Sequence, residues 1–326
     1  MKILSGCNLA VCITILGLAF SGCSTFPSSP SSKSSSRFDF ALIGDVPYRE
    51  ADATNAYPNM IEEINQARLA FVVHDGDIKD GLSPCTDAAL NRCYRQLQTF
   101  QHPFILLFGD NEWTDCWRLG FDPEERLNKL REIFTQGDRT MGHRTFPLER
   151  QSRDPQFAKF RENVRWTRGN VLFAGFNLPG SNNNYGKAEF AERNRANLAW
   201  LTNSFALAAR EKRSGLMLML QANPRFDLAS TNKARAGFND FLEVLERETI
   251  AFQKPVVLVH GDSHYFRIDK PMISARSQRR VENFTRVETF GYPDVHWLRA
   301  TVDARDPNVF SFRQELVKRN LIPHGR

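Results

Sequence analysis

The stretch Ile105-Leu106-Leu107-Phe108-Gly109-Asp110-Asn111-Glu112 decides the fold of this chain. It begins with an apolar run, and a glycine and then acidic and amide side chains follow at once. Short apolar runs bounded by glycine are typical of buried strands in a parallel sheet. We therefore predict a buried strand at residues 104–108 and a polar loop at its C-terminal end.

The same order of apolar run, glycine and acidic residue occurs at three other places. They are Gly44-Asp45 after Ala41-Leu42-Ile43, Gly76-Asp77 two residues after Phe71-Val72-Val73, and His260-Gly261-Asp262-Ser263-His264 after Val256-Val257-Leu258-Val259. The C-terminal ends of parallel strands meet at one edge of the sheet. Oxygen ligands together with a histidine suit a hard or borderline divalent cation. We therefore expect a metal site at this edge.

The order of these motifs resembles the calcineurin-like metallophosphoesterase family. The pattern of that family is an Asp near the start, then Gly-Asp, Gly-Asn-His-Asp/Glu, a lone His and finally Gly-His-x-His. The resemblance covers most of residues 37–315. It implies an α/β fold, a four-layer αββα sandwich of the metallophosphoesterase type. It also implies two divalent metal ions (Mn, Fe or Zn) and hydrolysis of a phosphomonoester or phosphodiester by metal-activated water.

The resemblance also implies a ligand for each metal. Asp77 holds the bridging position, so it would take part in catalysis. Asp45 and His264 would bind the first metal, and the amide oxygen of Asn111 would bind the second. The remaining ligand positions of the family fall on Asp262 and Gln221.

Four positions that usually carry an imidazole carry another residue here, namely Pro47, Glu112, Gln221 and Asp262. Glu112 would act as a catalytic general acid if burial raised its pKa, or as a carboxylate that orients Asn111 or His264. Most of the replacements are oxygen donors, which can still bind a metal. This favours a metal site with an altered ligand set over a site that has lost metal binding. The alternative is a catalytically degenerate lipoprotein that acts as a ligand-binding or interaction module.

Four further residues are candidates for supporting or substrate-binding roles. His260 would donate a hydrogen bond to a ligand, and Asn223 competes with Gln221 for the position of the lone histidine. Tyr48 and Arg49 directly follow the first motif and could bind the substrate phosphate, a group to which arginine is well suited.

The first residues predict export. Lys2, an apolar stretch at residues 9–20 and Ser21-Gly22-Cys23 form a secretory signal over residues 1–22. The cysteine resembles a bacterial lipoprotein processing site, so Cys23 would carry the lipid and anchor the chain to a membrane. An ordinary signal peptide or a weak membrane span are the alternatives. In lipoproteins a residue other than Asp after the cysteine usually goes with the outer membrane. Because Ser24 stands there, the resemblance implies an outer-membrane lipoprotein that faces the periplasm.

The sequence after the cysteine predicts a tether and one folded domain. Residues 23–36 are rich in Ser and Pro and have little to bury, so we expect a flexible tether. The metallophosphoesterase-like domain would then span residues 37–326. The formal charge is +6, which could attract anionic substrates or phospholipid head groups. The basic residues are scattered among acids and form no long run, so nucleic acid is not expected as the primary partner. A phosphorylated small molecule or an envelope component is the expected substrate.

Three cysteines, Cys85, Cys93 and Cys116, fall in the predicted folded domain. Cys93 falls in a predicted helix and shares a face with Leu90 and Leu97, so we interpret it as a buried thiol. Cys85 and Cys116 follow the second and third motif loops, which must meet if the metal site forms. We predict a disulfide between Cys85 and Cys116, with a pairing that involves Cys93 as the rival.

The remaining pattern alternates strands and helices and ends in a strand-rich tail. The predicted strands are 38–43, 70–74, 104–108, 164–168, 171–176, 216–220, 256–259, 265–268, 287–289, 297–302 and 309–314. The predicted helices are 57–67, 86–100, 123–134, 188–212 and 235–252. This order suggests two sheets between helices.

Overall fold

The computed structural model describes residues 37–321, all within the compact unit Ser34–Arg326. The predicted signal peptide at residues 1–22, the lipidated Cys23 and the tether at 23–36 lie outside the described residues. Within residues 37–321, none of the helices has the length and apolar character needed to cross a membrane.

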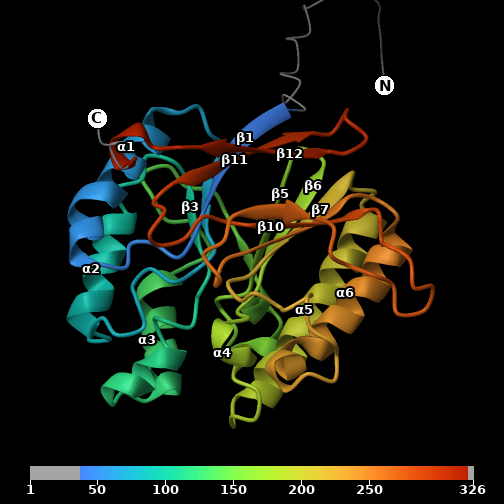
Figure 1. Cartoon of the computed structure of the whole chain (residues 1–326), viewed down its shortest axis with the longest axis horizontal. Helices are drawn as coiled ribbons and strands as arrows, with labels where there is room; N and C mark the ends of the chain where they lie inside the picture. Colours follow the sequence, from blue (N-terminus) through green and yellow to red (C-terminus); the bar gives the residue numbers. More distant parts are fainter. Residues whose placement is uncertain (1–36, 322–326) are drawn as a thin grey trace, which may run out of the picture. The chain divides into compact units, whose positions relative to one another are not determined.

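The described strands form two sheets (Figure 1). The first has the order β12-β11-β1-β2-β3, and the second has the order β4-β5-β6-β7-β8-β10-β9. The strands of the first sheet are β1 (Arg37–Ile43), β2 (Val72–His74), β3 (Phe104–Leu106), β11 (Trp297–Asp303) and β12 (Phe310–Glu315). Those of the second are β4 (Glu149–Arg150), β5 (Val164–Arg168), β6 (Val171–Gly175), β7 (Gly215–Met219), β8 (Val256–His260), β9 (Arg267–Asp269) and β10 (Phe284–Glu288).

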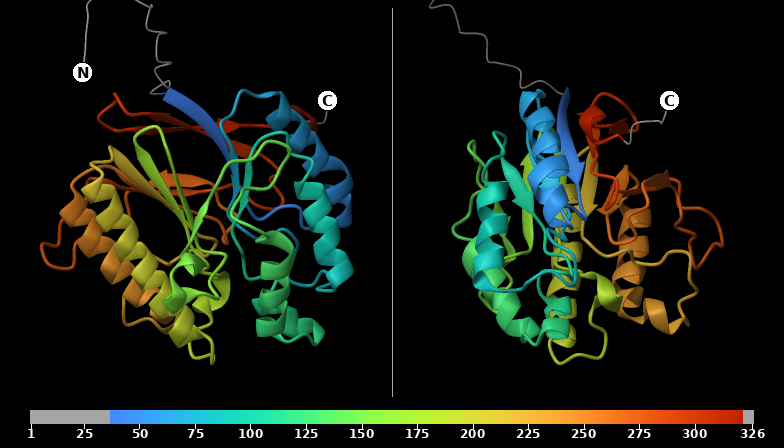
Figure 2. Two further views of the ribbon diagram at one scale, coloured as in Figure 1. Left: turned by 180° about the vertical axis from the view of Figure 1, so that it is seen from behind. Right: turned by 60° about the vertical axis from the view of Figure 1, so that its left-hand side comes forward.

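Helices cover the outer face of each sheet. They are α1 (Tyr57–Gln66), α2 (Asp87–Leu97), α3 (Pro123–Phe134), α5 (Phe190–Arg210) and α6 (Asn239–Phe252). The short α4 (Gly180–Asn183) lies in the loop that follows β6. Short 3-10 helices lie at Thr114–Leu119, Gln151–Arg153, Pro155–Phe157, Lys233–Phe238 and Lys318–Asn320, and a π-helix lies at Asp52–Ala56. Figure 2 shows α1, α2 and α3 on one side of the sheets and α5 and α6 on the other.

Two helix starts follow directly from local sequence. The side chain of Thr86 accepts a hydrogen bond from the backbone of Ala89 and caps α2. Asp122 does the same for α3 through Glu125, and Pro123 stands at the first helical position. Such caps satisfy backbone donors that a helix leaves free at its N-terminus, and each stabilises it by roughly 0.5–2 kcal/mol.

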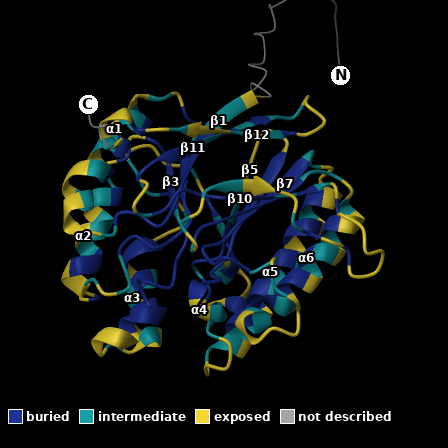
Figure 3. Ribbon diagram, viewed as in Figure 1, coloured by how far each residue is buried: buried dark blue, intermediate teal, exposed yellow. Residues whose placement is uncertain are grey.

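Alternation along β1 explains the layers. Ala41 and Ile43 belong to the core that packs against α1, α2 and α3. Phe40 and Leu42 point to the other face, into the core between the two sheets. Side chains of a strand alternate between faces, so a strand buried on both sides is apolar throughout. A third core joins the second sheet to α5 and α6, and Figure 3 shows the sheets buried between helices with exposed outer faces.

The predicted four-layer αββα sandwich of the metallophosphoesterase type is confirmed. The two-residue hairpin at Gly169-Asn170 is also present, because Arg168 pairs with Val171. Several details differ from the prediction. The strand expected at 104–108 ends at Leu106 as β3, and the one expected at 287–289 begins at Phe284 as β10. The strand expected at 265–268 begins at Arg267, where pairing with Glu288 starts. The helix expected at 235–252 is a 3-10 helix up to Phe238 and α6 from Asn239, and neither β4 nor α4 was predicted.

The topology brings the motif loops to one edge. β1, β2 and β3 pair in parallel, as do β6, β7 and β8. Asp45, Asp77 and Asn111 therefore follow the C-terminal ends of neighbouring strands, and His264 follows β8 in the facing sheet.

Candidate functional site

Four residues of the motif loops have a left-handed backbone. The φ angles are 51° at Asp45, 60° at Asp77, 76° at Asp262 and 56° at His264. This conformation costs residues other than glycine on the order of 1–3 kcal/mol each, and such strain gathers at functional sites. The four strained residues lie on the three loops that follow β1, β2 and β8, and these loops mark the candidate site.

Two glycines let these loops approach closely. A Cβ atom on Gly109 would lie 2.0 Å from Oδ1 of Asp77. A Cβ atom on Gly261 would lie 2.2 Å from Oδ2 of Asp45. Any other residue at these positions would displace a carboxylate, so the glycines of the motifs set the positions of the acidic side chains.

The hydroxyl of Tyr48 lies at the centre of the predicted ligand set. Its oxygen is 3.0 Å from Oδ2 of Asp77, 3.0 Å from Nε2 of His264 and 3.4 Å from Oδ1 of Asp45. It also accepts a hydrogen bond from Nδ2 of Asn111, at 3.0 Å. Burial and the nearby carboxylates raise the pKa of Tyr48, so the phenol keeps its proton. One proton therefore faces three acceptors, and the site is short of positive charge.

His264 is oriented by the backbone. Its Nδ1 lies 2.7 Å from the carbonyl oxygen of Tyr292, so Nδ1 carries the proton and Nε2 of the neutral ring keeps its lone pair. Nε2 lies 3.6 Å from Oδ1 of Asp45. A backbone carbonyl that fixes the ring in this way is the usual support of a metal-binding histidine.

Asp77 is surrounded by hydrogen-bond donors. Its Oδ2 accepts from Nδ2 of Asn111 at 2.8 Å and from Nε2 of Gln221 at 3.2 Å. Its Oδ1 accepts from the backbone N–H of Asn111 at 3.0 Å. Both amides thus present nitrogen to the carboxylate, where the resemblance implied oxygen ligands for a second metal.

The donor set of the site fits one of the two implied metals and not the other. Asp45 and His264 carry suitable ligand atoms that face a common point beside the Tyr48 hydroxyl, and they fit one divalent cation. The second position does not fit, because the amides of Asn111 and Gln221 compensate the charge of Asp77 by hydrogen bonds. At neither position do residues 37–321 place three or more His, Cys, Asp or Glu side chains around one metal.

Glu112 is fully buried and joins two motif loops. Its Oε1 accepts hydrogen bonds from the backbone N–H of Gly109, at 2.8 Å, and of Asp77, at 3.1 Å. Its Oε2 has no hydrogen-bond partner. Burial raises the pKa of Glu112 to about 7. The carboxyl thus contacts neither the side chain of Asn111 nor that of His264, and its bonds position the loops.

Further carboxyls lie in the same buried region with few cations. Burial and mutual repulsion raise the pKa of Asp45 and Asp77, and burial raises that of Asp110 to about 6. Lys79 is buried nearby, and burial lowers its pKa. Buried negative charge of this kind is stable only if it is protonated or paired with a cation.

Three further predicted residues, Asp262, Asn223 and His260, lie at or beside the last motif loop. Asp262 does not face the centre, because its Oδ2 accepts the backbone N–H of Asn223 at 3.0 Å. The Nδ2 of Asn223 donates to the Oγ of Ser263. His260 lies 2.8 Å from the carbonyl oxygen of Gly261, and burial lowers its pKa to about 3. These three residues support the last motif loop.

The left-handed turn at α4 belongs to the polar stretch Ser181-Asn182-Asn183-Asn184-Tyr185, which the sequence offers either as a rim of the pocket or as a plain Asn-rich turn. Ser181 and the three asparagines after it have φ between 51° and 54°. The turn directs the Oγ of Ser181 to Asp110, at 3.0 Å, and to Asp115, at 3.3 Å. Asparagine tolerates this backbone better than most residues, so the run of three asparagines was the available signal.

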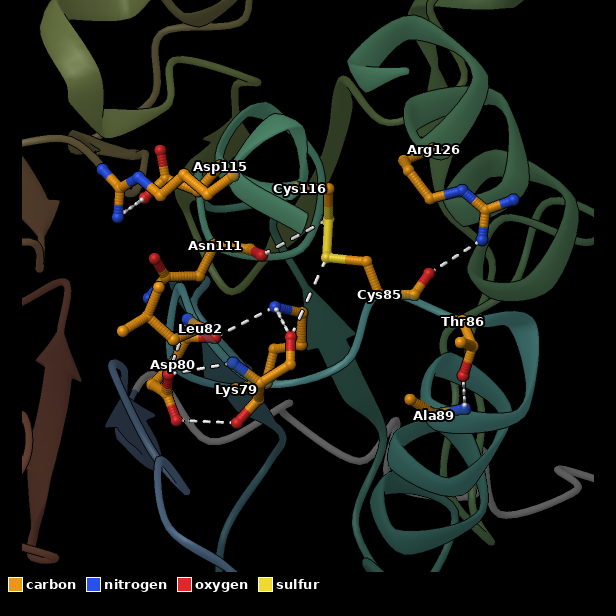
Figure 4. Close-up of a disulfide and its surroundings, with 12 residues drawn as sticks. Lys79, Asp80, Leu82, Cys85, Thr86, Ala89, Asn111, Asp115, Cys116 and Arg126 are labelled. Atoms are coloured by element: carbon orange, nitrogen blue, oxygen red, sulfur yellow. Dashed lines mark hydrogen bonds and ion pairs between the residues drawn. A yellow bond between two sulfur atoms is a disulfide. The ribbon is translucent and has the colours of Figure 1, made fainter. Parts of the chain in front are cut away.

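The predicted disulfide between Cys85 and Cys116 is confirmed (Figure 4). The Sγ of Cys116 lies 3.8 Å from the carbonyl oxygen of Asn111. Cys93 is a free, half-buried thiol, so the rival pairing is excluded. The bridge links the loops after β2 and β3, which carry Asp77 and Asn111.

A cavity of about 350 Å³ adjoins the site on the far side of Tyr48. Its charged lining consists of Arg49, Lys79 and Arg92 with a single acid, Glu50. The guanidinium of Arg49 lies 4.7 Å from the centre of the Tyr292 ring, which in turn stacks on Tyr48. Arg49 therefore lies beside the site rather than in it.

Comparisons with known proteins agree at the level of fold. No protein-family model and no curated protein matches the chain. The structure of PhoD matches at 12% identity and a TM-score of 0.50, over 82% of this chain and 64% of that chain, so this chain spans about two thirds of its length. GAP50, the anchor in the inner membrane complex of Plasmodium, matches at 13% identity and a TM-score of 0.53, over 88% of this chain and 87% of GAP50. A 5'-nucleotidase from Candida albicans matches at 12% identity and a TM-score of 0.42, over 85% of this chain and 50% of the nucleotidase chain.

Proposed function

We propose that the chain is a phosphoester hydrolase that works with one divalent cation, for which Mn, Fe and Zn are the candidates. The observation that carries the proposal is the pairing of Asp45 with His264 beside a hydroxyl whose one proton faces three acceptors. The cation would be held by a carboxylate oxygen of Asp45 and Nε2 of His264, with the hydroxyl of Tyr48 as a third ligand. When bound, it would act as a Lewis acid on a phosphoryl oxygen.

The remaining residues have the roles that their contacts suggest. Asn111 and Gln221 hold the Asp77 carboxylate by hydrogen bonds, so this charge needs no second cation. Tyr48 remains protonated and can donate its proton toward Asp77, at 3.0 Å. Glu112 positions the two loops through their backbone N–H groups.

The cavity beside Tyr48 suits the remainder of a phosphoester substrate. Its volume of about 350 Å³ is that of a small-molecule site. Arg49 and Arg92 offer the planar guanidinium groups that recognise phosphate oxygens in pairs. We expect a phosphomonoester or phosphodiester whose second anionic or polar group enters this cavity.

The proposed location is the bacterial cell envelope. The leader with Ser21-Gly22-Cys23 supports an outer-membrane lipoprotein that faces the periplasm, anchored through the lipid on Cys23. The bridge between Cys85 and Cys116 is compatible with such an exported protein, because disulfides persist in oxidising compartments.

Metal analysis of the purified full chain, together with hydrolysis of generic phosphomonoester and phosphodiester dyes, tests the proposal. We expect one bound cation per chain and turnover that depends on it. Asp45→Asn should lose both, whereas Asn111→Ala should keep the cation. Asp306→Asn, an exposed residue of the same type, is the matched control and should match the unmodified chain.

A second candidate is a ligand-binding or interaction module without turnover. The observation that favours it is the carboxylate of Asp77, whose Oδ2 already accepts hydrogen bonds from the Tyr48 hydroxyl and from the amides of Asn111 and Gln221. A folded protein that takes up no cation and hydrolyses neither dye would establish this candidate and reject the first. Two bound cations would instead contradict the assignment of Asn111 and Gln221 as donors to Asp77.

A further inference from the structure

Two adjoining cavities at the opposite edge of the sheets are lined by arginine. One has a volume of about 770 Å³ and the other about 560 Å³, and Arg168 lines both. We name this surface the arginine face and define it by Arg37, Arg68, Arg144, Arg168, Arg210 and Arg213. The acidic residues of the two linings are Asp39, Glu149 and Glu211.

The acids of this surface are already paired. Glu149 binds Arg165, Glu211 binds Arg213, and Asp39 lies 3.5 Å from Arg299.

Several arginines of the face, by contrast, have no carboxylate partner. Within the described chain this holds for Arg68, Arg144, Arg168 and Arg210. Arg144 contacts only the ring of His102 and a backbone carbonyl, and Arg168 lies over the ring of Phe38 at 5.3 Å. These four arginines therefore add positive charge to the face that no carboxylate of residues 37–321 pairs with.

The arginine face lies at the end of the sheets where the domain begins. Arg37 opens β1, and the β5–β6 turn reaches the same end, since a Cβ atom on Gly169 would lie 3.2 Å from the ring of Phe38 (Figure 1). Strand β1 runs from this end to the candidate site, and its seven residues span roughly 23 Å. The 36 residues that precede Arg37, with their apolar segment, are joined to the domain at this face.

We propose that the arginine face docks onto the anionic phospholipid head groups of a membrane surface. Unpaired guanidinium groups are attracted to lipid phosphates, and each basic residue near such a surface strengthens binding by about fivefold. Docking in this way turns the candidate site away from the bilayer, toward substrates in the aqueous space. This inference stands on the arginine face alone and does not depend on the proposed hydrolase activity.

The test is co-sedimentation of the full chain with phosphatidylcholine vesicles, with and without about one quarter phosphatidylglycerol. Neutral vesicles report the contribution of the N-terminal segment, and the difference between the two vesicle types reports the face. We expect at least about tenfold tighter binding to the anionic vesicles, falling steeply as salt rises above about 0.1 M.

The variant that probes the face is the double substitution Arg68→Glu and Arg210→Glu. Both side chains are exposed and lack partners within residues 37–321, so the fold should persist. This variant should lose about tenfold or more of the anionic preference. The matched control is Arg95→Glu with Arg195→Glu, which makes the same charge change at exposed positions of α2 and α5 and should keep the preference.

Three results would overturn the proposal. The first is equal binding to neutral and anionic vesicles. The second is an equal loss in the variant and in the control, since net charge rather than this face would then explain binding. The third is displacement from anionic vesicles by duplex DNA at matched phosphate concentration, because the face would then prefer a nucleic acid.

Discussion

The hydroxyl oxygen of Tyr48 lies 3.0 Å from Nε2 of His264, although the two residues are 216 positions apart in the chain. The same oxygen contacts Asp77 and Asn111. A phenol thus joins the first motif loop to the last, and the cation that we propose must share its ligands with this hydroxyl.

Removing this hydroxyl should weaken both the fold and the site. Tyr48→Phe leaves the buried carboxylate of Asp77 with one donor fewer, which costs about 1–3 kcal/mol of unfolding free energy. It should also lower cation affinity. Urea denaturation with and without chelator measures the first effect, and metal titration the second. Tyr292→Phe, on the ring stacked against Tyr48, is the control, and equal losses in both variants would contradict the assignment.

Replacing an amide of the site by a carboxylate should make the stability of the protein depend on a bound cation. Asn111→Asp removes the donor that lies 2.8 Å from Oδ2 of Asp77 and places a second negative charge there. We expect the chelated protein to lose about 2–4 kcal/mol of stability and to regain most of it with Mn²⁺ or Zn²⁺. Thermal unfolding with and without cation measures this. If the cation does not change the stability of the variant, the role of Asn111 as a donor to Asp77 is refuted.

The disulfide should contribute strongly to stability. Cys85 and Cys116 are 31 positions apart, and closing a loop of this length stabilises a fold by about 2–4 kcal/mol. Reductant should therefore lower the melting temperature and loosen the Asn111 loop. Cys116→Ser should be insensitive to reductant and start from the lower value. Cys93→Ser keeps the bridge and should still respond, so a response lost in that variant would point to a different pairing.

The buried carboxyls predict an unusual pH dependence for the chelated protein. Burial raises the pKa of Glu112 from 4.5 to about 7 and that of Asp110 from 3.8 to about 6. Between the unfolded and folded values the folded state holds more protons, so the free energy of unfolding falls as pH rises through this window and then levels off. Denaturation curves from about pH 5 to about pH 8 measure this.

Two comparisons sharpen this pH experiment. Glu112→Gln keeps an oxygen for the two backbone donors and cannot titrate, so its curve should be flatter. Adding a saturating divalent cation should also flatten the curve, because it compensates the same charge. A stability that instead rises across the window in the chelated protein would show that these carboxyls are paired in solution.

The fold could be predicted because its signals are local. The apolar runs before Gly44, Gly76 and Gly109 define buried strands by composition alone, and the caps at Thr86 and Asp122 mark where α2 and α3 begin. The starts of β9 and α6 were harder to predict. Pairing with β10 decides where β9 begins, and a 3-10 helix decides where α6 begins.

The site could be predicted only in part. Sequence order identified Asp45, Asp77, Asn111 and His264, and the structure brings these four together. It could not reveal that Asn111 presents nitrogen rather than oxygen to Asp77, since the direction of an amide depends on its neighbours in space.

By itself, then, the sequence determined the layers, the strand-end loops and the acidic motifs, because these depend on periodicity, glycine positions and short-range spacing. The tertiary structure decided that Cys85 pairs with Cys116 rather than with Cys93. Only the tertiary structure decided that Tyr48 stands among the ligands and that Glu112 binds backbone. It also decided that arginines as distant in sequence as Arg68 and Arg210 share one face. Contacts between residues far apart in the chain set these features, and only the folded chain brings such residues within hydrogen-bonding or Coulombic range.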